Sequence, residues 1–324
     1  MELRDAATVM LVRDAPEGGG IEVFMLRRNL NSDFVGGAYV FPGGAVDPED
    51  RHDNLGPVCT GRTDTDASTR LGIERGGLAY WVAAIRESFE EAGVLLAYDE
   101  SGEIVRLTDH DSTTTSRFLA HRAAVDASER RLVEVCEEEG LRLAVDQIYY
   151  FSHWITPEGA PRRYDTRFFV ARAPQAQVPL HDDVETIAHL WIRPAEALAR
   201  HRAGEFELVF PTMRSLVALD RFTSADDLLT HAAAIDEVPA ILPRIVAEPE
   251  GGLRIVLPGD PEYASAAPAG EAAFPVGVPM NKLGLRGAGD AQVGQPDDAE
   301  AIAPTSATPS VGSLGPAHHG PNGS

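Results

Sequence analysis

Cysteine is scarce in this chain, and its scarcity excludes two classes of small protein. The 324 residues contain two cysteines, Cys59 and Cys136, which could form one disulfide at most. A disulfide-stabilised scaffold needs several such pairs, and a structural zinc site needs ligands at a close paired spacing that neither cysteine has. We therefore expect two reduced thiols in a cytoplasmic protein.

Basic residues are also few relative to acidic ones. Lysine and arginine number 28 against 50 aspartates and glutamates, so the formal net charge is -22. Nucleic acids and anionic membranes attract basic surfaces, so this charge argues against both as partners. A phosphorylated small molecule is not excluded, because metal ions and a few local arginines can reverse the electrostatic field within one site.

Long apolar runs are absent as well. The start of the chain, MELRDAATVMLV, lacks the apolar segment of a signal peptide. No later stretch approaches the roughly 20 apolar residues of a membrane span. The chain is nevertheless 44% hydrophobic, which is enough for a well-buried core. We expect a cytoplasmic globular protein; a homodimer is compatible with the sequence, which does not determine the oligomeric state.

The chain does contain a dense acidic segment, RESFEEAGV, from Arg86 to Val94. On a helix of 3.6 residues per turn, Glu87, Glu90 and Glu91 project from one face. Like charges at this spacing cost roughly 0.2–0.5 kcal/mol per pair unless they are neutralised. Magnesium prefers carboxylate oxygens and shares its other positions with substrate phosphates, so a metal site is one interpretation. The alternative is a solvated acidic face with an ordinary Arg86–Glu90 pair.

This segment resembles the second half of the Nudix box, G-x5-E-x7-R-E-U-x-E-E-x-G-U, in which U is aliphatic. Upstream, the run YVFPGGAV resembles the strand and glycine turn on which such boxes begin. Ser88 departs from the pattern at the first U position. The matching positions are Arg86, Glu87, Glu90, Glu91, Gly93 and Val94.

The box is interrupted. Counting from Gly44, the first acidic position falls on Asp50, and 35 residues separate Asp50 from Arg86 where the motif has seven. A second register starting at Gly72 places Leu78 where glutamate belongs and has no preceding FPGG, so we prefer the split box. Its interruption is similar to that of the Nudix branch whose animal members are peroxisomal acyl-coenzyme A diphosphatases. The chain ends PNGS, unlike a peroxisomal tripeptide, so their location is not transferred.

The resemblance covers about residues 6–261 and implies an α/β fold, the Nudix-type α/β/α sandwich with a mixed sheet. We expect a Nudix hydrolase domain over residues 1–204, with residues 47–77 as an insertion within the box that forms a loop and a short helix. Residues 205–263 would form a C-terminal helical extension packed on this domain. Residues 264–324 are dominated by Ala, Gly, Pro, Ser and Asp, a composition that predicts disorder.

Periodicity and turn residues predict the individual elements. A hairpin is expected from strands 6–12 and 21–28, joined by APEGGG. The remaining predicted strands are 148–156, 164–171, a segment ending at Trp191, and 254–257. Leu78, Val82, Ile85 and Phe89 recur at helical spacing and predict a helix over 78–92, which Gly93 ends as a left-handed cap. The other predicted helices are two within 116–139, 194–203, 210–220 and 224–234. The acidic run Glu137–Glu139 is predicted to be a solvated helix end.

The resemblance implies a role for each acidic residue of the box. Magnesium or manganese would bind Glu87, Glu90 and Glu91, with Glu87 as a ligand or the base. Arg86 would hold these carboxylates in register. One or more metal ions would shield the substrate's charge and lower the pKa of a bound water.

A further acid is expected from the segment HDDVETIAHLWI. Nudix enzymes often complete the metal site or supply the base from a loop at this point, and Glu185 is the candidate, with Asp182 and Asp183 beside it. The alternative is that these acidic residues are ordinary loop residues that only improve solubility. His181 and His189 are interpreted as incidental.

Substrate contacts are predicted around the glycine turn and at one hairpin. Coenzyme A diphosphatases carry arginines just before FPGG, and the forked guanidinium of arginine suits phosphate oxygens. The alternative to substrate binding is that each arginine is an ordinary charged residue of the surface. Trp154 and Tyr164 could stack an adenine. The candidates are Arg27, Arg28, Gly43, Gly44, Arg162, Arg163 and Tyr164.

The predicted function is metal-dependent hydrolysis of a diphosphate linkage in a small nucleoside diphosphate derivative. The interrupted box favours coenzyme A or acyl-coenzyme A, cleaved to 3',5'-ADP and 4'-phosphopantetheine products. An ADP-ribose or dinucleotide (NADH-type) diphosphatase is the enzymatic alternative. The non-enzymatic alternative is a Nudix-like sensor that binds a nucleotide without hydrolysing it. The presence of all three glutamates argues against this alternative.

Overall fold

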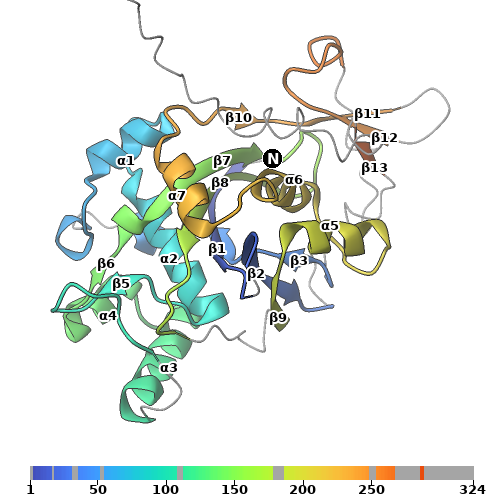
Figure 1. Ribbon diagram of the computed structural model, residues 1–324. Helices are drawn as coiled ribbons and strands as arrows, with labels where there is room; N and C mark the ends of the chain where they lie inside the picture. The colour runs from blue at the N-terminus through green and yellow to red at the C-terminus, as the bar shows by residue number, and fades with distance from the viewer. Residues whose placement is uncertain are drawn as a thin grey trace, which may run out of the picture.

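A computed structural model describes residues 3–16, 18–30, 36–51, 55–107, 112–177, 186–247, 253–266 and 285–287. Its central element is a large β-sheet with helices on both faces (Figure 1). Within the described part of the chain, no helix has the length and apolar character needed to cross a membrane.

The main sheet is mixed, as predicted. Its strands follow the order β10-β7-β8-β1-β2-β3, with β4 paired to β1 and β9 paired to β2. The pairs β1–β8 and β10–β7 are parallel, and the other pairs are antiparallel. The strands are β1 (Leu3–Asp14), β2 (Ile21–Arg28), β3 (Tyr39–Val40), β4 (Gly43–Ala45), β7 (Ile148–Ile155), β8 (Arg163–Arg172), β9 (Thr186–Ile192) and β10 (Ala240–Ile241).

One face of the sheet is covered by α2, which packs against β1 and β4. Ala7, Val9 and Leu11 of β1 contribute to the core beneath it. This side also carries the short pair β5 (Ala97–Tyr98) and β6 (Arg142–Leu143). The helices here are α1 (Asp64–Leu71), α2 (Leu78–Ala92), α3 (Ser112–Asp126) and α4 (Leu132–Glu139).

The opposite face is covered by α5 (Pro194–Arg202), α6 (Phe210–Leu219) and α7 (Ala225–Ala233). Met10 and Val12 of β1 point into this second core, because successive strand residues face opposite sides. Both faces of β1 are therefore buried, which explains its nearly continuous apolar sequence. The two helical layers around one mixed sheet confirm the expected α/β/α sandwich.

The predicted insertion, residues 47–77, contains the 3-10 helices Pro48–Arg51 and Gly56–Val58 and then α1. Thr63 caps α1, and α1 packs against α2. The insertion is thus more regular than the predicted loop with one short helix.

The C-terminal region is less helical than predicted. Besides α6 and α7, it adds β10 to the main sheet and forms a separate sheet of β11 (Arg244–Ala247), β12 (Leu253–Val256) and β13 (Leu285–Gly287) (Figure 1). The strand β13 lies within the segment predicted to be disordered, and its pairing with β12 corrects that prediction locally. Residues 267–284 and 288–324 lie outside the described residues, and the domain boundaries stay predictions.

Candidate active site

The acidic segment forms the last turns of α2 and lines a cleft of about 790 Å³. Glu87, Glu90 and Glu91 are 8%, 9% and 5% exposed, so α2 is buried all round rather than presenting one solvated acidic face. Gly93 ends the helix in the left-handed conformation, with φ 66°, as predicted for a C-terminal cap.

Arg86 organises these carboxylates. Its Nη1 donates to Oε1 of Glu87 at 2.9 Å and to Oε2 of Glu90 at 2.8 Å. Its Nε donates to Oδ1 of Asp50 at 3.0 Å, and its Nη2 donates to Oδ2 of the same residue at 3.0 Å. Asp50 is only 2% exposed. The two halves of the interrupted box therefore meet through a buried, bidentate ion pair.

The glycine turn lies directly against the same helix. The backbone N–H of Gly43 donates to Oε2 of Glu91 at 2.8 Å. A Cβ added at Gly44 would lie 2.7 Å from Cδ of Glu87, which is closer than side chains pack. Glycine at position 44 therefore lets the carboxylate of Glu87 rest on the backbone of β4.

Burial dominates the electrostatics of the cluster. It raises the pKa of Glu87 to about 8 and that of Glu90 to about 7, with Arg86 opposing the shift in both. Burial lowers the pKa of Arg86, but its carboxylate neighbours outweigh burial and hold that pKa above its ordinary value. The guanidinium of Arg86 thus lies within 3.4 Å of four carboxylates, those of Asp47, Asp50, Glu87 and Glu90. Hard oxygen donors with uncompensated negative charge are the ligand chemistry that fits magnesium or manganese.

The predicted substrate-binding residues separate into two groups. Arg28, Gly43, Gly44, Arg162 and Tyr164 line the cleft. Arg27 and Arg163, the immediate neighbours of Arg28 and Arg162, are not among the described lining residues of the cleft.

Arg27 and Arg163 make other contacts. Arg27 donates from Nε to the carbonyl of Gly37 at 3.4 Å, and Arg163 donates to the carbonyl of Thr156 at 3.2 Å. Adjacent residues of an extended chain point to opposite sides, so one arginine of each doublet is expected to face away from the cleft. Their role in substrate binding stays a prediction.

Glu185, Asp182, Asp183 and His181 lie outside the described residues, and the role of Glu185 stays a prediction. His189 belongs to β9 and stacks on Phe24 at a ring-centroid distance of 5.6 Å, and it does not appear among the described lining residues.

The α3–α4 connection forms a wall of the cleft that sequence reasoning missed. Its charged side chains have no apolar periodicity that marks them as facing a site, and they resemble ordinary solvated helix ends. Arg122 of α3 donates to the backbone carbonyl of Glu90 at 2.8 Å, which fixes this wall to α2. The lining residues from this wall include Asp126, Glu129, Arg130, Arg131 and Glu134.

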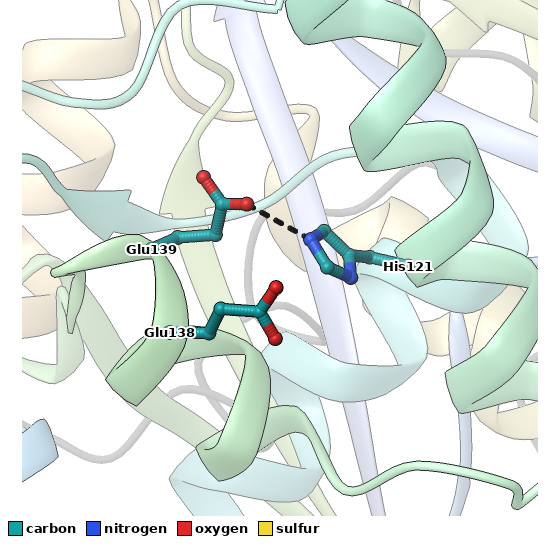
Figure 2. Close-up of side chains that lie close together, drawn as sticks. All are labelled: His121, Glu138 and Glu139. Carbon is teal, nitrogen blue, oxygen red and sulfur yellow. Dashed lines mark hydrogen bonds and ion pairs between the residues drawn. The ribbon is translucent and has the colours of Figure 1, made fainter.

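A second group of candidate metal ligands is formed by His121 in the C-terminal half of α3 with Glu138 and Glu139 at the end of α4 (Figure 2). Nε2 of His121 lies 3.0 Å from Oε1 of Glu139, and Arg117 donates to the same oxygen at 2.7 Å. Arg130 pairs with Glu138. Arginines therefore already compensate both glutamates, and the side chain of Glu139 is only 12% exposed. The prediction of a solvated helix end is wrong for Glu139.

The α/β/α sandwich, together with an RExxEE helix resting on a glycine turn, defines the Nudix hydrolase class. The family described as the NUDT19 Nudix domain matches residues 58–219, which is half of the chain. The chain therefore belongs to this family and is a Nudix hydrolase, an enzyme.

Known proteins of similar sequence support this classification. Acyl-coenzyme A diphosphatase NUDT19 of Gallus gallus is 28% identical over 304 residues, covering 80% of this chain and 79% of that protein. The Homo sapiens protein of the same name is 28% identical over 284 residues, covering 76% and 74%. A crystal structure of a NUDIX hydrolase from Alicyclobacillus acidocaldarius has a TM-score of 0.58 at 27% identity, covering 71% of this chain and 96% of that one.

Proposed function

We propose that this enzyme hydrolyses the diphosphate linkage of coenzyme A or acyl-coenzyme A, giving 3',5'-ADP and 4'-phosphopantetheine products. The observation that carries the proposal is the buried cluster of Glu87, Glu90 and Glu91 against the glycine turn, at the bottom of a cleft large enough for a nucleotide. The names of the similar proteins support the choice of acyl-coenzyme A.

Glu87, Glu90 and Glu91 would hold Mg²⁺ or Mn²⁺. When bound, such an ion offsets the negative charge of the diphosphate and makes a coordinated water more acidic. Arg86 contributes without touching substrate, because its bonds to Glu87 and Glu90 hold two of the carboxylates in one orientation. The bond from Gly43 orients the third.

Other residues of the cleft would position the substrate. Arg28 and Arg162 offer planar guanidinium groups that suit phosphate oxygens, and Tyr164 offers an aromatic ring. Glu185 stays our candidate for the residue that completes the metal site or accepts the proton from the attacking water. A base is required because the nucleophile must lose a proton as it attacks phosphorus.

The test is a panel of coenzyme A, acyl-coenzyme A, ADP-ribose and NADH, each with Mg²⁺ or Mn²⁺, with products identified by chromatography. The proposal expects 3',5'-ADP from the first two substrates, and no product once EDTA removes the metal. Preferential cleavage of ADP-ribose or NADH would favour the dinucleotide alternative. Binding without any product would favour a sensor.

Glu90→Gln should abolish metal-dependent turnover while leaving the fold intact, because it replaces a negatively charged metal ligand with a neutral side chain of the same size. Glu137→Gln is the matched control, since Glu137 is an exposed residue of α4 that is not among the described lining residues of the cleft. Activity of Glu90→Gln at saturating magnesium would count against the assigned site.

A further inference from the structure

A second cavity, of about 380 Å³, adjoins the cleft on the sheet face covered by α6. Thr8, Gly43, Tyr164 and Thr166 line both spaces, and so does Arg28. The two spaces therefore adjoin one another along β1 and β8, and a substrate held at the glycine turn lies beside the second space, which we call the apolar cavity.

The apolar cavity differs from the cleft in its chemistry. Its lining includes Trp154 and Phe168 from β7 and β8, and also Ile245 and Ile255 from β11 and β12, which do not line the cleft. Phe210 and Met213 of α6 close it from above.

Basic groups are sparse in the apolar cavity. Among its described lining residues, arginine and histidine are represented by Arg28 and His201 alone, and His201 already contacts the carbonyl of Phe206 at 2.8 Å. The cleft, in contrast, carries arginines on several sides, among them Arg4, Arg130 and Arg162. Burying a phosphate without such partners is costly, so phosphate groups favour the cleft.

We propose that the apolar cavity receives the pantetheine arm of the substrate, with its thioester-linked end toward Ile245 and Ile255. The inference rests on the proposed function, and it names which half of coenzyme A each space takes. The adenosine half carries an additional 3'-phosphate and belongs with the arginines of the cleft. The pantetheine arm carries amides and a hydroxyl but no charge beyond its single phosphate, so it suits a lining of apolar and threonine side chains with few basic groups.

The size of the apolar cavity agrees with this occupant. A methylene-sized group fills about the same volume as a water molecule, roughly 30 Å³. The cavity therefore accommodates on the order of a dozen such groups, which is the larger part of the pantetheine arm. A long acyl chain would have to continue past the two isoleucines.

The test uses two variants of the cavity wall and one control in the full-length protein. Val209→Phe fills the space from the start of α6, and Phe210→Ala removes an aromatic ring that packs edge-on to Trp154 at a centroid distance of 5.9 Å. Val217→Phe is the control: it makes the same substitution on the same helix, at a partly buried residue that is not among the described lining residues. Urea unfolding verifies that each variant folds.

Inhibition by 4'-phosphopantetheine and by 3',5'-ADP, measured separately, distinguishes the two halves of the substrate. Each methylene group excluded from apolar surroundings weakens binding about fourfold. Val209→Phe and Phe210→Ala should therefore weaken inhibition by 4'-phosphopantetheine by about tenfold or more, and raise the KM for coenzyme A. Inhibition by 3',5'-ADP should stay within about twofold, and the control should change neither.

Three outcomes overturn the inference. Weaker inhibition by 3',5'-ADP in the two variants would place the nucleotide in the apolar cavity. Unchanged inhibition by both fragments in folded variants would leave the cavity without a substrate role. If the wild-type enzyme cleaves neither coenzyme A nor acyl-coenzyme A and binds neither fragment, the proposed function itself fails, and the inference fails with it.

Discussion

Replacing Gly44 with alanine should reduce hydrolysis about a hundredfold while leaving the protein folded. The three atoms nearest to an added Cβ all belong to the side chain of Glu87, with Cδ at 2.7 Å and Oε2 at 2.8 Å. The φ of Gly44 does not lie in the left-handed region, so the backbone itself accepts alanine. The perturbation therefore falls on one carboxylate.

The size of the effect follows from that overlap. Carbon atoms in contact rest about 3.5–4.0 Å apart, so the carboxylate of Glu87 must move by about 1 Å. A misplacement of about 1 Å in a catalytic group can cost 10²-fold in rate, which corresponds to about 2.7 kcal/mol of transition-state stabilisation. The free energy of unfolding should change by less than about 1 kcal/mol, because the obstructing atoms are at the end of a side chain.

The assay compares kcat/KM for coenzyme A at saturating magnesium with the free energy of unfolding in urea. Gly56→Ala is the matched control, since no atom lies within 4 Å of its added Cβ and its φ is not positive. It should retain wild-type values in both measurements.

A double-mutant cycle isolates the cause. If alanine at position 44 acts by displacing Glu87, it should add little further loss in a Glu87→Ala background, because the obstructing side chain is gone. Wild-type activity of Gly44→Ala, or an equal additional loss in the Glu87→Ala background, would refute the reasoning.

The remaining predictions concern stability and thiol reactivity. Gly43→Ala should lower the free energy of unfolding by about 1–3 kcal/mol, because its Cβ would lie 2.7 Å from backbone atoms of β1; an unchanged urea midpoint would contradict this. Asp50→Asn should cost about 2 kcal/mol in the same measurement, since the buried Arg86 loses an ionic partner, and a change below about 0.5 kcal/mol would show that the pair is dispensable. Burial raises the pKa of both Cys59 and Cys136 to about 12. At pH 8 the folded protein should therefore not react with a disulfide reagent, whereas the unfolded chain should. Rapid labelling of the native protein would disprove this burial.

Local patterns predicted the regular elements well. The spacing of Leu78, Val82, Ile85 and Phe89 predicted α2, and Gly93 predicted its end, because helix periodicity and a left-handed cap depend on neighbouring residues. The hairpin of β1 and β2 was predicted for the same reason. Elements that depend on distant pairing, such as β13, were missed, because a strand of three residues has too few side chains to display a period.

The candidate site was accessible to the sequence only in part. The glutamate triplet and the glycine turn could be identified because each is a continuous motif. The wall contributed by α3 and α4 could not, since its residues look like a solvated surface until the chain folds them over the cleft. The arginine doublets could not be divided from the sequence, because it does not specify which residue of each doublet lines the cleft; in the structure these are Arg28 and Arg162.

By itself, the sequence determined the chemistry available to this protein: three carboxylates on one helix face, an arginine beside them and a glycine turn, all encoded within short stretches. Only the tertiary structure decided how these parts meet. Burial of Asp50 beside Arg86 joins two segments separated by 35 residues, and the packing of α6 over the sheet creates the apolar cavity. Both depend on contacts between residues far apart in the chain, and such contacts have no local periodicity from which they could be predicted.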